Sequence, residues 1–311
     1  AIATGGCTEE LQPQTCGTNG TVPDESELTE AVLNLSVNTF AVEAQAKTRA
    51  SIPSSTPEME TAQEKEVHNI WVFQYDAATK ELLIKPRYYT ITDQAILQEL
   101  PVYLKAGVPS LVYAVTNTGY DNWANDGTDA SWQKFKQLEQ LKKQTLPTAF
   151  PLRSIDKVSI PMAGASGQVE VTTGITVTVP VTRMYAKLKV KVEMLKAEMK
   201  LNNVNVRQIP NICRVETLAG DGNGEPMDAV PFPVGTTFSS IAFAASDLEK
   251  NEDKEWAVFY VPENLQGEIE TQGGNKSDAA PSNALVVDVT TEIGGERYLY
   301  AAYPGGKSFN N

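Results

Sequence analysis

The sequence predicts an all-β chain of two domains, and three observations support this. Short segments in which apolar and polar residues alternate recur along the chain, as expected for strands with one buried face. Turn residues such as Asp, Asn, Gly and Pro separate these segments. The length of 311 residues is long for one all-β domain and sufficient for two, each with its own core.

The first strand is predicted in the segment 31–39, where apolar and polar side chains alternate. One face of this strand carries Leu33, Leu35, Val37 and Thr39. The following segment, 43–61, is rich in Ala, Ser, Thr and Pro and is predicted to be a loop. It contains one arginine, in the pair Arg49-Ala50. The segment 67–76 is apolar and aromatic enough to form a central strand.

One short helix is predicted in the first domain, with Asp129 as its N-cap. Apolar residues recur there at helical spacing: Trp132, Phe135, Leu138 and Leu141. The second domain is predicted to open with the clearest alternation in the chain, from Ala186 to Met194. The apolar face of that strand lies opposite a face of Lys and Glu side chains.

Composition and charge exclude several classes of partner. Hydrophobic residues make up 41% and charged residues 21%, so extensive disorder is not expected. The net charge of −13 argues against nucleic acid, because phosphate binding requires a basic surface. It also argues against electrostatic docking on anionic lipid. No run approaches the roughly 18 apolar residues that a membrane span requires.

No residue constellation predicts catalysis, a cofactor or a metal site. The only histidine, His68, falls in a predicted strand beside apolar residues, where a packed or rim side chain is the usual finding. The chain contains no HExxH motif and no Walker-type glycine loop. With 39 acidic residues, counting selects no carboxylate pair for a glycosidase. The spacing of Cys7, Cys16 and Cys213 misses every zinc pattern.

The first residues point to a lipid anchor. Small residues from Ala1 to Gly6 precede Cys7, an order that resembles a bacterial lipobox, although Thr4 stands where a larger apolar side chain is preferred. We expect Cys7 to be acylated and the polar segment 8–30 to act as a tether. The alternative is a thiol in a disordered N-terminus, oxidised with Cys16.

Several short motifs, in order, resemble those of the fimbrillins, the pilus subunits of Bacteroidales. The first is an Arg-Ala pair between a first strand and a core strand, here Arg49-Ala50. Four others are a strand ending in Thr116-Asn117, a Pro-Met-small-Gly turn at 161–164, a strand opening at 183–187 and a Tyr-x-Pro-Glu-Asn segment at 260–264. The resemblance covers nearly the whole chain from Ala31 onward.

The resemblance implies two transthyretin-like, Greek-key β-sandwich domains. The chain then divides into a lipoprotein tether (1–30), an N-terminal domain with a releasable first strand (31–173) and a C-terminal domain (174–311). Family members usually continue into further C-terminal strands that serve as the donor. We therefore expect the last domain either to be truncated or to lack a donor.

The implied function is a structural subunit of a cell-surface fimbria that supports adhesion. An outer-membrane lipoprotein precursor would be cut between Arg49 and Ala50 by an arginine-specific protease. Loss of the strand with Leu33, Leu35, Val37 and Thr39 would then allow donor-strand exchange with other pilus subunits. The membrane would be reached only through the lipid anchor. The alternative is a monomeric surface-anchored adhesin or glycan-binding lipoprotein, and an enzyme ranks third.

Overall fold

The computed structural model describes residues 28–37, 63–119, 123–124, 128–147, 160–192, 194, 196–215, 232–245, 249–251, 254–262 and 283–302. Strands dominate these residues, and the only α-helices among them are two helices of five residues each. The all-β prediction is therefore confirmed. No helix in this part of the chain is both long enough and apolar enough to cross a membrane.

The chain folds into two compact units, neither of which is continuous in sequence. Unit 1 comprises Ala1–Asn38, Glu66–Lys143 and Pro161–Thr182, and unit 2 comprises Thr39–Lys65, Gln144–Ile160 and Arg183–Asn311. The predicted domain boundary after residue 173 falls before a strand that pairs within the first sheet (Thr176–Arg183). This difference arises because strand pairing, not sequence order, decides to which core a segment belongs.

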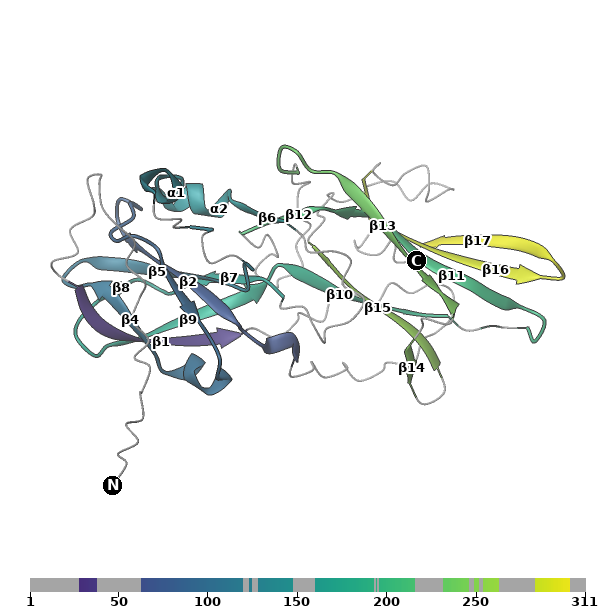
Figure 1. Ribbon diagram of the computed structural model, residues 1–311, viewed down its shortest axis with the longest axis horizontal. Coiled ribbons are helices and arrows are strands. Elements are labelled where there is room, and N and C mark those ends of the chain that lie inside the picture. Colours follow the sequence, from purple (N-terminus) through teal and green to yellow (C-terminus); the bar gives the residue numbers. More distant parts are fainter. Residues whose placement is uncertain are drawn as a thin grey trace, which may run out of the picture. The chain divides into compact units, whose positions relative to one another are not determined.

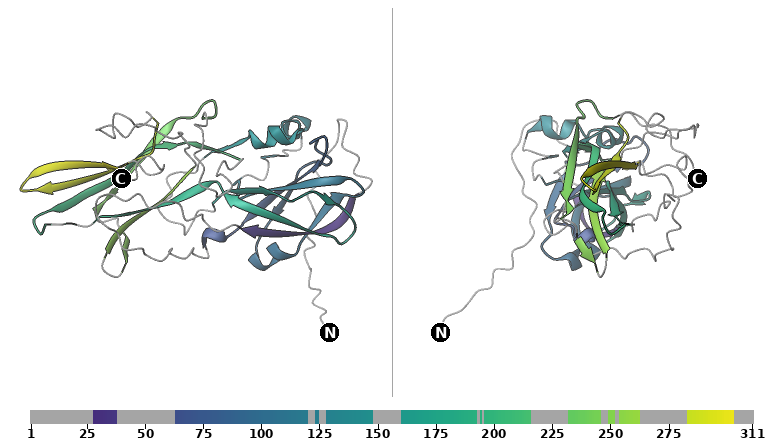
Figure 2. Two further views of the ribbon diagram at one scale, coloured as in Figure 1. Left: turned by 180° about the vertical axis from the view of Figure 1, so that it is seen from behind. Right: turned by 90° about the vertical axis from the view of Figure 1, so that its right-hand side faces the viewer.

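Unit 1 is built on one eight-stranded sheet. Its strands in chain order are β1 (Leu28–Val37), β2 (Asn69–Asp76), β3 (Arg87–Thr90), β4 (Leu100–Lys105), β5 (Pro109–Thr116), β7 (Met162–Ala165), β8 (Val169–Glu170) and β9 (Thr176–Arg183). Across the sheet the order is β3-β2-β5-β7-β9-β1-β4, with β8 paired to β5. The views in Figure 1 and Figure 2 show β1, β4 and β9 side by side.

One hydrophobic core joins the two halves of this sheet. Its buried side chains come from β1, β4 and β9 on one side and from β2, β5 and β7 on the other; they include Leu33, Leu35, Val102, Leu104, Val177, Val179, Ile70, Val72, Val112, Ala114 and Met162. Because strands from opposite ends of the order share this core, the sheet closes on itself as a β-sandwich.

The second face of β2 is covered by aromatic packing. Phe73 lies 5.3 Å from Phe135 and 6.2 Å from Trp123, measured between ring centroids. The hydroxyl of Tyr75 donates to Phe135 O at 2.9 Å, and burial raises the pKa of Tyr75. Phe135 follows α1 (Asp129–Gln133) and precedes α2 (Leu138–Lys142). Both faces of β2 are therefore buried, as the sequence predicts for a central strand.

The predicted single helix is two short helices, and its predicted cap is displaced. Thr128, not Asp129, is the N-cap of α1. Between the helices the backbone turns to strand-like pairing: Leu82 N donates to Lys136 O at 2.8 Å and Leu138 N to Lys80 O at 3.0 Å. This pairing interrupts the helical hydrogen bonds, although the apolar residues keep helical spacing. Gln137 then starts α2 with a reciprocal capping box to Gln140.

Unit 2 contains two larger sheets and a short strand pair. The four-stranded sheet has the order β13 (Phe238–Ala244), β11 (Lys200–Pro210), β16 (Val286–Ile293), β17 (Glu296–Ala302). The three-stranded sheet has the order β10 (Tyr185–Lys191), β15 (Lys254–Pro262), β14 (Glu249–Asn251), and β6 (Thr145–Pro147) pairs with β12 (Ile212–Arg214).

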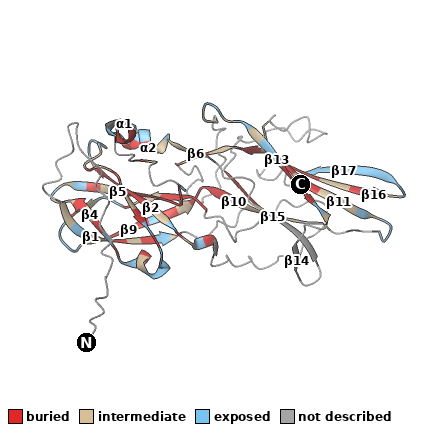
Figure 3. Ribbon diagram, viewed as in Figure 1, coloured by how far each residue is buried: buried red, intermediate tan, exposed pale blue. Residues whose placement is uncertain are grey.

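The core of unit 2 again combines side chains from different sheets. Buried residues come from β11, β13, β15 and β16: Val204, Val206, Ile209, Ile241, Phe243, Phe259, Val261 and Val287. Leu188 and Val190 of β10 pack against them, on the face that the alternation predicts to be apolar. In contrast, all seven residues of β17 are exposed, as the pale blue hairpin strand in Figure 3 shows.

Candidate functional site

Strand β1 completes the first sheet between two neighbours that run in opposite directions. It pairs antiparallel with β4, from Leu28 opposite Lys105 to Leu33 opposite Leu100. It pairs parallel with β9, from Val32 opposite Thr176 to Val37 opposite Val181. Among the described strands β1 is the only partner of β4. Removal of β1 would therefore leave β4 without a strand partner and would open a gap beside β9.

The side chains of β1 show the alternation expected from the sequence. Leu33 is fully buried and Leu35 is 2% exposed, and Val37 packs against the same core at partial burial. Thr39, predicted to extend this face, lies outside the described residues. Burial of these apolar side chains is worth roughly 5–8 kcal/mol before entropy is considered. A strand held so firmly does not leave the sheet without a chemical or competitive step.

The start of β1 is fixed by contacts with the turn before β9. Gly174 N donates to Glu30 O at 2.9 Å, and Val32 N donates to Ile175 O at 2.8 Å. The hydroxyls of Thr29 and Thr173 lie 2.7 Å apart. Gly174 has a φ of +73°, which favours glycine in this turn.

The predicted processing residues Arg49 and Ala50 lie outside the described residues, as does the predicted lipidation site Cys7. The structure resumes at η2 (Gln63–Lys65), and Glu64 in this short helix is fully buried. Its Oε1 lies 2.6 Å from Lys187 Nζ and accepts from the Tyr260 hydroxyl at 2.6 Å. The Nε of Arg183 donates to Glu64 O at 3.0 Å. Within unit 2, Glu64 thus fixes the chain that follows residue 62 to β10 and β15.

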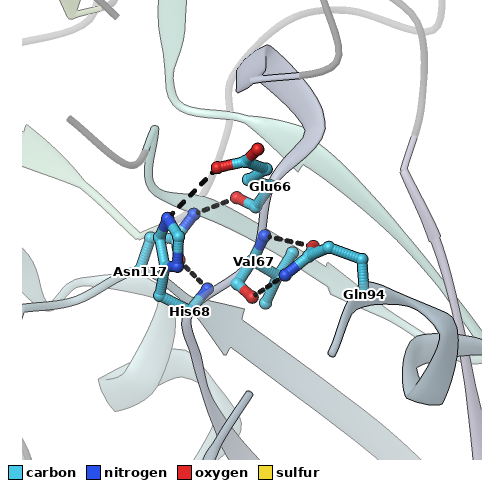
Figure 4. Close-up of polar contacts among 5 residues, drawn as sticks. All are labelled: Glu66, Val67, His68, Gln94 and Asn117. Carbon is cyan, nitrogen blue, oxygen red and sulfur yellow. Dashed lines mark hydrogen bonds and ion pairs between the residues drawn. The ribbon is translucent and has the colours of Figure 1, made fainter. Parts of the chain in front are cut away.

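Between Glu66 and His68 the chain is fixed a second time, now within unit 1. His68 N donates to Asn117 Oδ1 at 2.9 Å, and Asn117 Nδ2 donates to Glu66 O at 2.9 Å. Figure 4 shows the Asn117 amide and the Gln94 amide approaching this segment from opposite sides. The segment that leads into β2 is therefore held by side-chain amides before the strand pairing begins.

Gln94 pairs with both main-chain polar groups of one residue, Val67. Its Nε2 donates to Val67 O at 2.8 Å, and Val67 N donates to Gln94 Oε1 at 2.8 Å. Gln94 begins η3 (Gln94–Gln98), which leads directly into β4. A glutamine amide offers one donor and one acceptor to the N–H and C=O of the same extended residue, so it substitutes here for a neighbouring strand.

Gln74 in β2 makes the same arrangement at the other end of β4. Its Nε2 donates to Lys105 O at 2.8 Å, and Lys105 N donates to Gln74 Oε1 at 2.7 Å. The same Nε2 lies 2.9 Å from Ser110 Oγ, which itself donates to Val108 O at 2.6 Å. Gln74 is fully buried, and its bond to Ser110 is made away from water, whereas its two bonds to Lys105 are partly buried.

The geometry of His68 does not assemble a catalytic site. Its side chain is 51% exposed, and Nε2 lies 3.6 Å from Glu66 Oε2. Within the part of the chain that the structure describes, no group of three or more His, Cys, Asp and Glu side chains is placed to hold a metal ion. The thiol of Cys213 is buried in unit 2, with Sγ 3.7 Å from Leu146 O. Together with burial, this thiol raises the pKa of Tyr185.

The sequence motif at 161–164 has a packing role that the turn prediction missed. Gly164 lies in β7, and a Cβ placed on it would lie 1.8 Å from Pro180 O of β9. Only glycine lets the backbones of β7 and β9 approach so closely. The motif therefore belongs to the sheet that also receives β1.

The two β-sandwich units form a fold that the chain shares with solved structures. The chain shares its fold with the tip fimbrial protein Mfa3 from Porphyromonas gingivalis, solved with a C-terminal truncation. The identity is 15%, the TM-score 0.53, and the match covers 91% of this chain and 86% of Mfa3. The resemblance to fimbrillins is thus confirmed at the level of the fold.

Two further solved structures are similar to the chain. A fimbrial assembly protein from Parabacteroides distasonis is 15% identical with a TM-score of 0.47, and the match covers 89% of this chain and 85% of that one. The fimbrial anchor protein Mfa2 from Porphyromonas gingivalis is 13% identical with a TM-score of 0.43, covering 85% and 78%.

In sequence, residues 259–311 match a family model described as a domain of unknown function (DUF4906). Among the curated proteins, none matches the chain in sequence.

Sequence reasoning missed Glu64, Gln74 and Gln94. A charged residue in a segment rich in Gln, Glu and Lys gives no sign of burial. Gln74 carried a signal, because it interrupts the apolar run of β2 at a position that faces the core together with Ile70 and Val72. A polar residue at such a position requires partners, and this requirement points to a structural bond.

Proposed function

We propose that the chain is a structural subunit of a cell-surface fimbria, assembled by strand exchange. The observation that carries the proposal is the position of β1: it is the first described strand, it lies inside the sheet, and it is the only described partner of β4. The predicted cut after Arg49 separates β1 from every later strand. The shared fold with a tip fimbrial protein supports this class of function.

In this proposal, proteolysis changes β1 from an internal strand to a separate peptide. Its departure exposes the apolar side chains of β4 and β9 and the backbone groups that faced β1. A strand from another subunit then restores the pairing by strand addition. The contacts of Glu64 and His68 hold the start of the remaining chain on the folded protein. Only the residues before the cut are therefore lost.

The test is limited digestion with an arginine-specific protease. We expect a new N-terminus at Ala50, loss of residues 1–49 and formation of oligomers that resist sodium dodecyl sulfate. Arg49→Ala should remain monomeric after the same treatment. Arg297→Ala, which removes an exposed arginine from β17, is the matched control and should assemble like the parent. Cut protein that keeps β1 and never oligomerises, even with full-length C-terminal sequence present, would contradict strand exchange and favour the monomeric adhesin.

The precursor is proposed to reach the surface as an outer-membrane lipoprotein anchored through Cys7. This proposal rests on the small residues before Cys7 and the polar segment after it. A Cys7→Ala precursor should lose the mass of the lipid and no longer partition into detergent. Cys16→Ala is the control, since it removes a neighbouring thiol and should leave the anchor intact. Normal surface sorting of Cys7→Ala would refute the anchor.

A further inference from the structure

We propose that Gln74, assisted by Gln94, is a positioning residue that holds β4 in place when β1 is absent. The proposal deepens the strand-exchange function and rests on it. Strand exchange requires both sides of the gap to keep their positions, and β9 retains β7 as its neighbour in the sheet. For β4 no second strand is present among the described residues.

The two glutamines attach β4 to β2 at both ends of the strand. Gln94 lies six residues before Leu100, the first residue of β4, and bonds Val67, two residues before β2. Gln74 lies near the end of β2 and bonds Lys105, the last residue of β4. Neither attachment uses an atom of β1.

The two glutamine side chains differ in burial. Gln94 is exposed, so water competes for its amide. Gln74 is fully buried, and its loss would leave the main-chain groups of Lys105 without the partners that they bond in the structure. The buried apolar side chains of β4, Leu100, Val102 and Leu104, anchor the strand to the core independently. The Gln74 amide fixes the position of Lys105, the last residue of β4. It thereby sets the register in which an incoming strand pairs with β4.

The first measurement uses the intact chain and does not depend on proteolysis. Hydrogen exchange at Val32 N, which bonds Ile175 O, reports opening of β1 from β9. Exchange at Lys105 N, which bonds Gln74 Oε1, reports the position of β4. We expect Lys105 to exchange at least about tenfold more slowly than Val32, as for regions that open separately. Equal rates would overturn the proposal, because β4 would then leave whenever β1 does.

The second measurement uses protein cut after Arg49 and a labelled peptide of residues 28–37. Gln74→Met, which keeps the side-chain length and removes the hydrogen bonds to Lys105 and Ser110, should take up the peptide several-fold more slowly than the parent. Gln98→Met, an exposed glutamine in the same η3 helix as Gln94, should behave like the parent. Gln94→Ala should show a smaller effect, which keeps the test open if Gln74→Met does not fold.

The outcomes separate the two proposals. Peptide uptake by Gln74→Met at the parental rate would overturn the role of Gln74. If the parent keeps its own β1 and takes up no peptide, strand exchange fails. The exchange rates of Lys105 and Val32 would then still decide whether β4 is held independently.

Discussion

The Oε1 of Glu64 lies 2.6 Å from the Nζ of Lys187, and the carboxylate is fully buried while the ammonium group remains partly accessible. Tyr260 donates to the same oxygen. A buried carboxylate is tolerated only when it is paired and hydrogen-bonded, and here both conditions are met. Lys187 lies on the face of β10 that the sequence predicts to be polar, but its ammonium group binds a buried carboxylate in unit 2.

Removal of one member of this pair should destabilise unit 2 more than removal of both. We expect Lys187→Met to cost about 3 kcal/mol, because it leaves the Glu64 charge buried without its cation. The double variant Glu64→Gln/Lys187→Met should lose less than Lys187→Met alone. Denaturant unfolding of the four proteins measures the coupling, and additive losses would contradict it.

Gly164 is predicted to be intolerant of even one extra methyl group. A Cβ at this position meets the Pro180 backbone at 1.8 Å, so Gly164→Ala must separate β7 from β9. We expect a loss of about 3 kcal/mol in the free energy of unfolding. Gly167→Ala is the matched control: it lies three residues away and meets nothing within 4 Å. Equal stability of the two variants would show that the strands do not approach this closely.

Asn117 combines backbone conformation with side-chain bonding, and two substitutions separate these contributions. Its φ is +55°, and its amide bonds Glu66 and His68. Asn117→Gly keeps the backbone conformation and should lose about 1–2 kcal/mol of unfolding free energy through the missing hydrogen bonds. Asn117→Ala adds backbone strain and should lose about 1 kcal/mol more. Thermal unfolding of both variants tests this order, and a purely conformational role would leave Asn117→Gly as stable as the parent.

Asp76 should make the turn after β2 sensitive to acid. Hydrogen bonds from the amides of Thr79 and Ala78 lower the pKa of this carboxyl group below its ordinary value of 3.8. Because the folded-state pKa is depressed, the stabilisation is present above the unfolded pKa and is lost as the pH falls through the folded pKa. Asp76→Ala should therefore lower the melting temperature at neutral pH, with a difference that shrinks in strong acid. A difference independent of pH would contradict the assignment.

The sequence was sufficient to predict the strands whose burial follows a simple alternation. Leu33, Leu35 and the apolar face of β10 lie as expected, because period-two patterning directly reflects which face is covered. The membership of β9 in the first sheet was not predictable in this way, since its alternation fits either core. The break between α1 and α2 was also hidden, because it depends on pairing with residues 80–82, far away in sequence.

The bonding residues of the candidate site lie at the limit of such reasoning. Gln74 bonds Lys105, 31 residues away in sequence, and Glu64 bonds Lys187 and Tyr260, 123 and 196 residues away. A local sequence pattern carries no information about such distant partners. What a sequence does show is a polar residue on an otherwise apolar face. In β2 this signal marked Gln74, whose amide bonds Lys105 of β4. Strand β4 is the neighbour of β1, the strand that is predicted to leave.

The opposite directions of β4 and β9 have a consequence for the polarity of the proposed polymer. A strand inserted between them forms one parallel and one antiparallel ladder whichever way it runs, since its two neighbours are themselves antiparallel. Main-chain pairing alone therefore does not distinguish a head-to-tail fibre from one in which successive members alternate in direction. That choice falls to side-chain volume at the positions of Ala31, Leu33 and Leu35, where a small residue is followed by two large ones. A segment inserted in the reverse direction would place a large side chain at the fully buried position of Ala31.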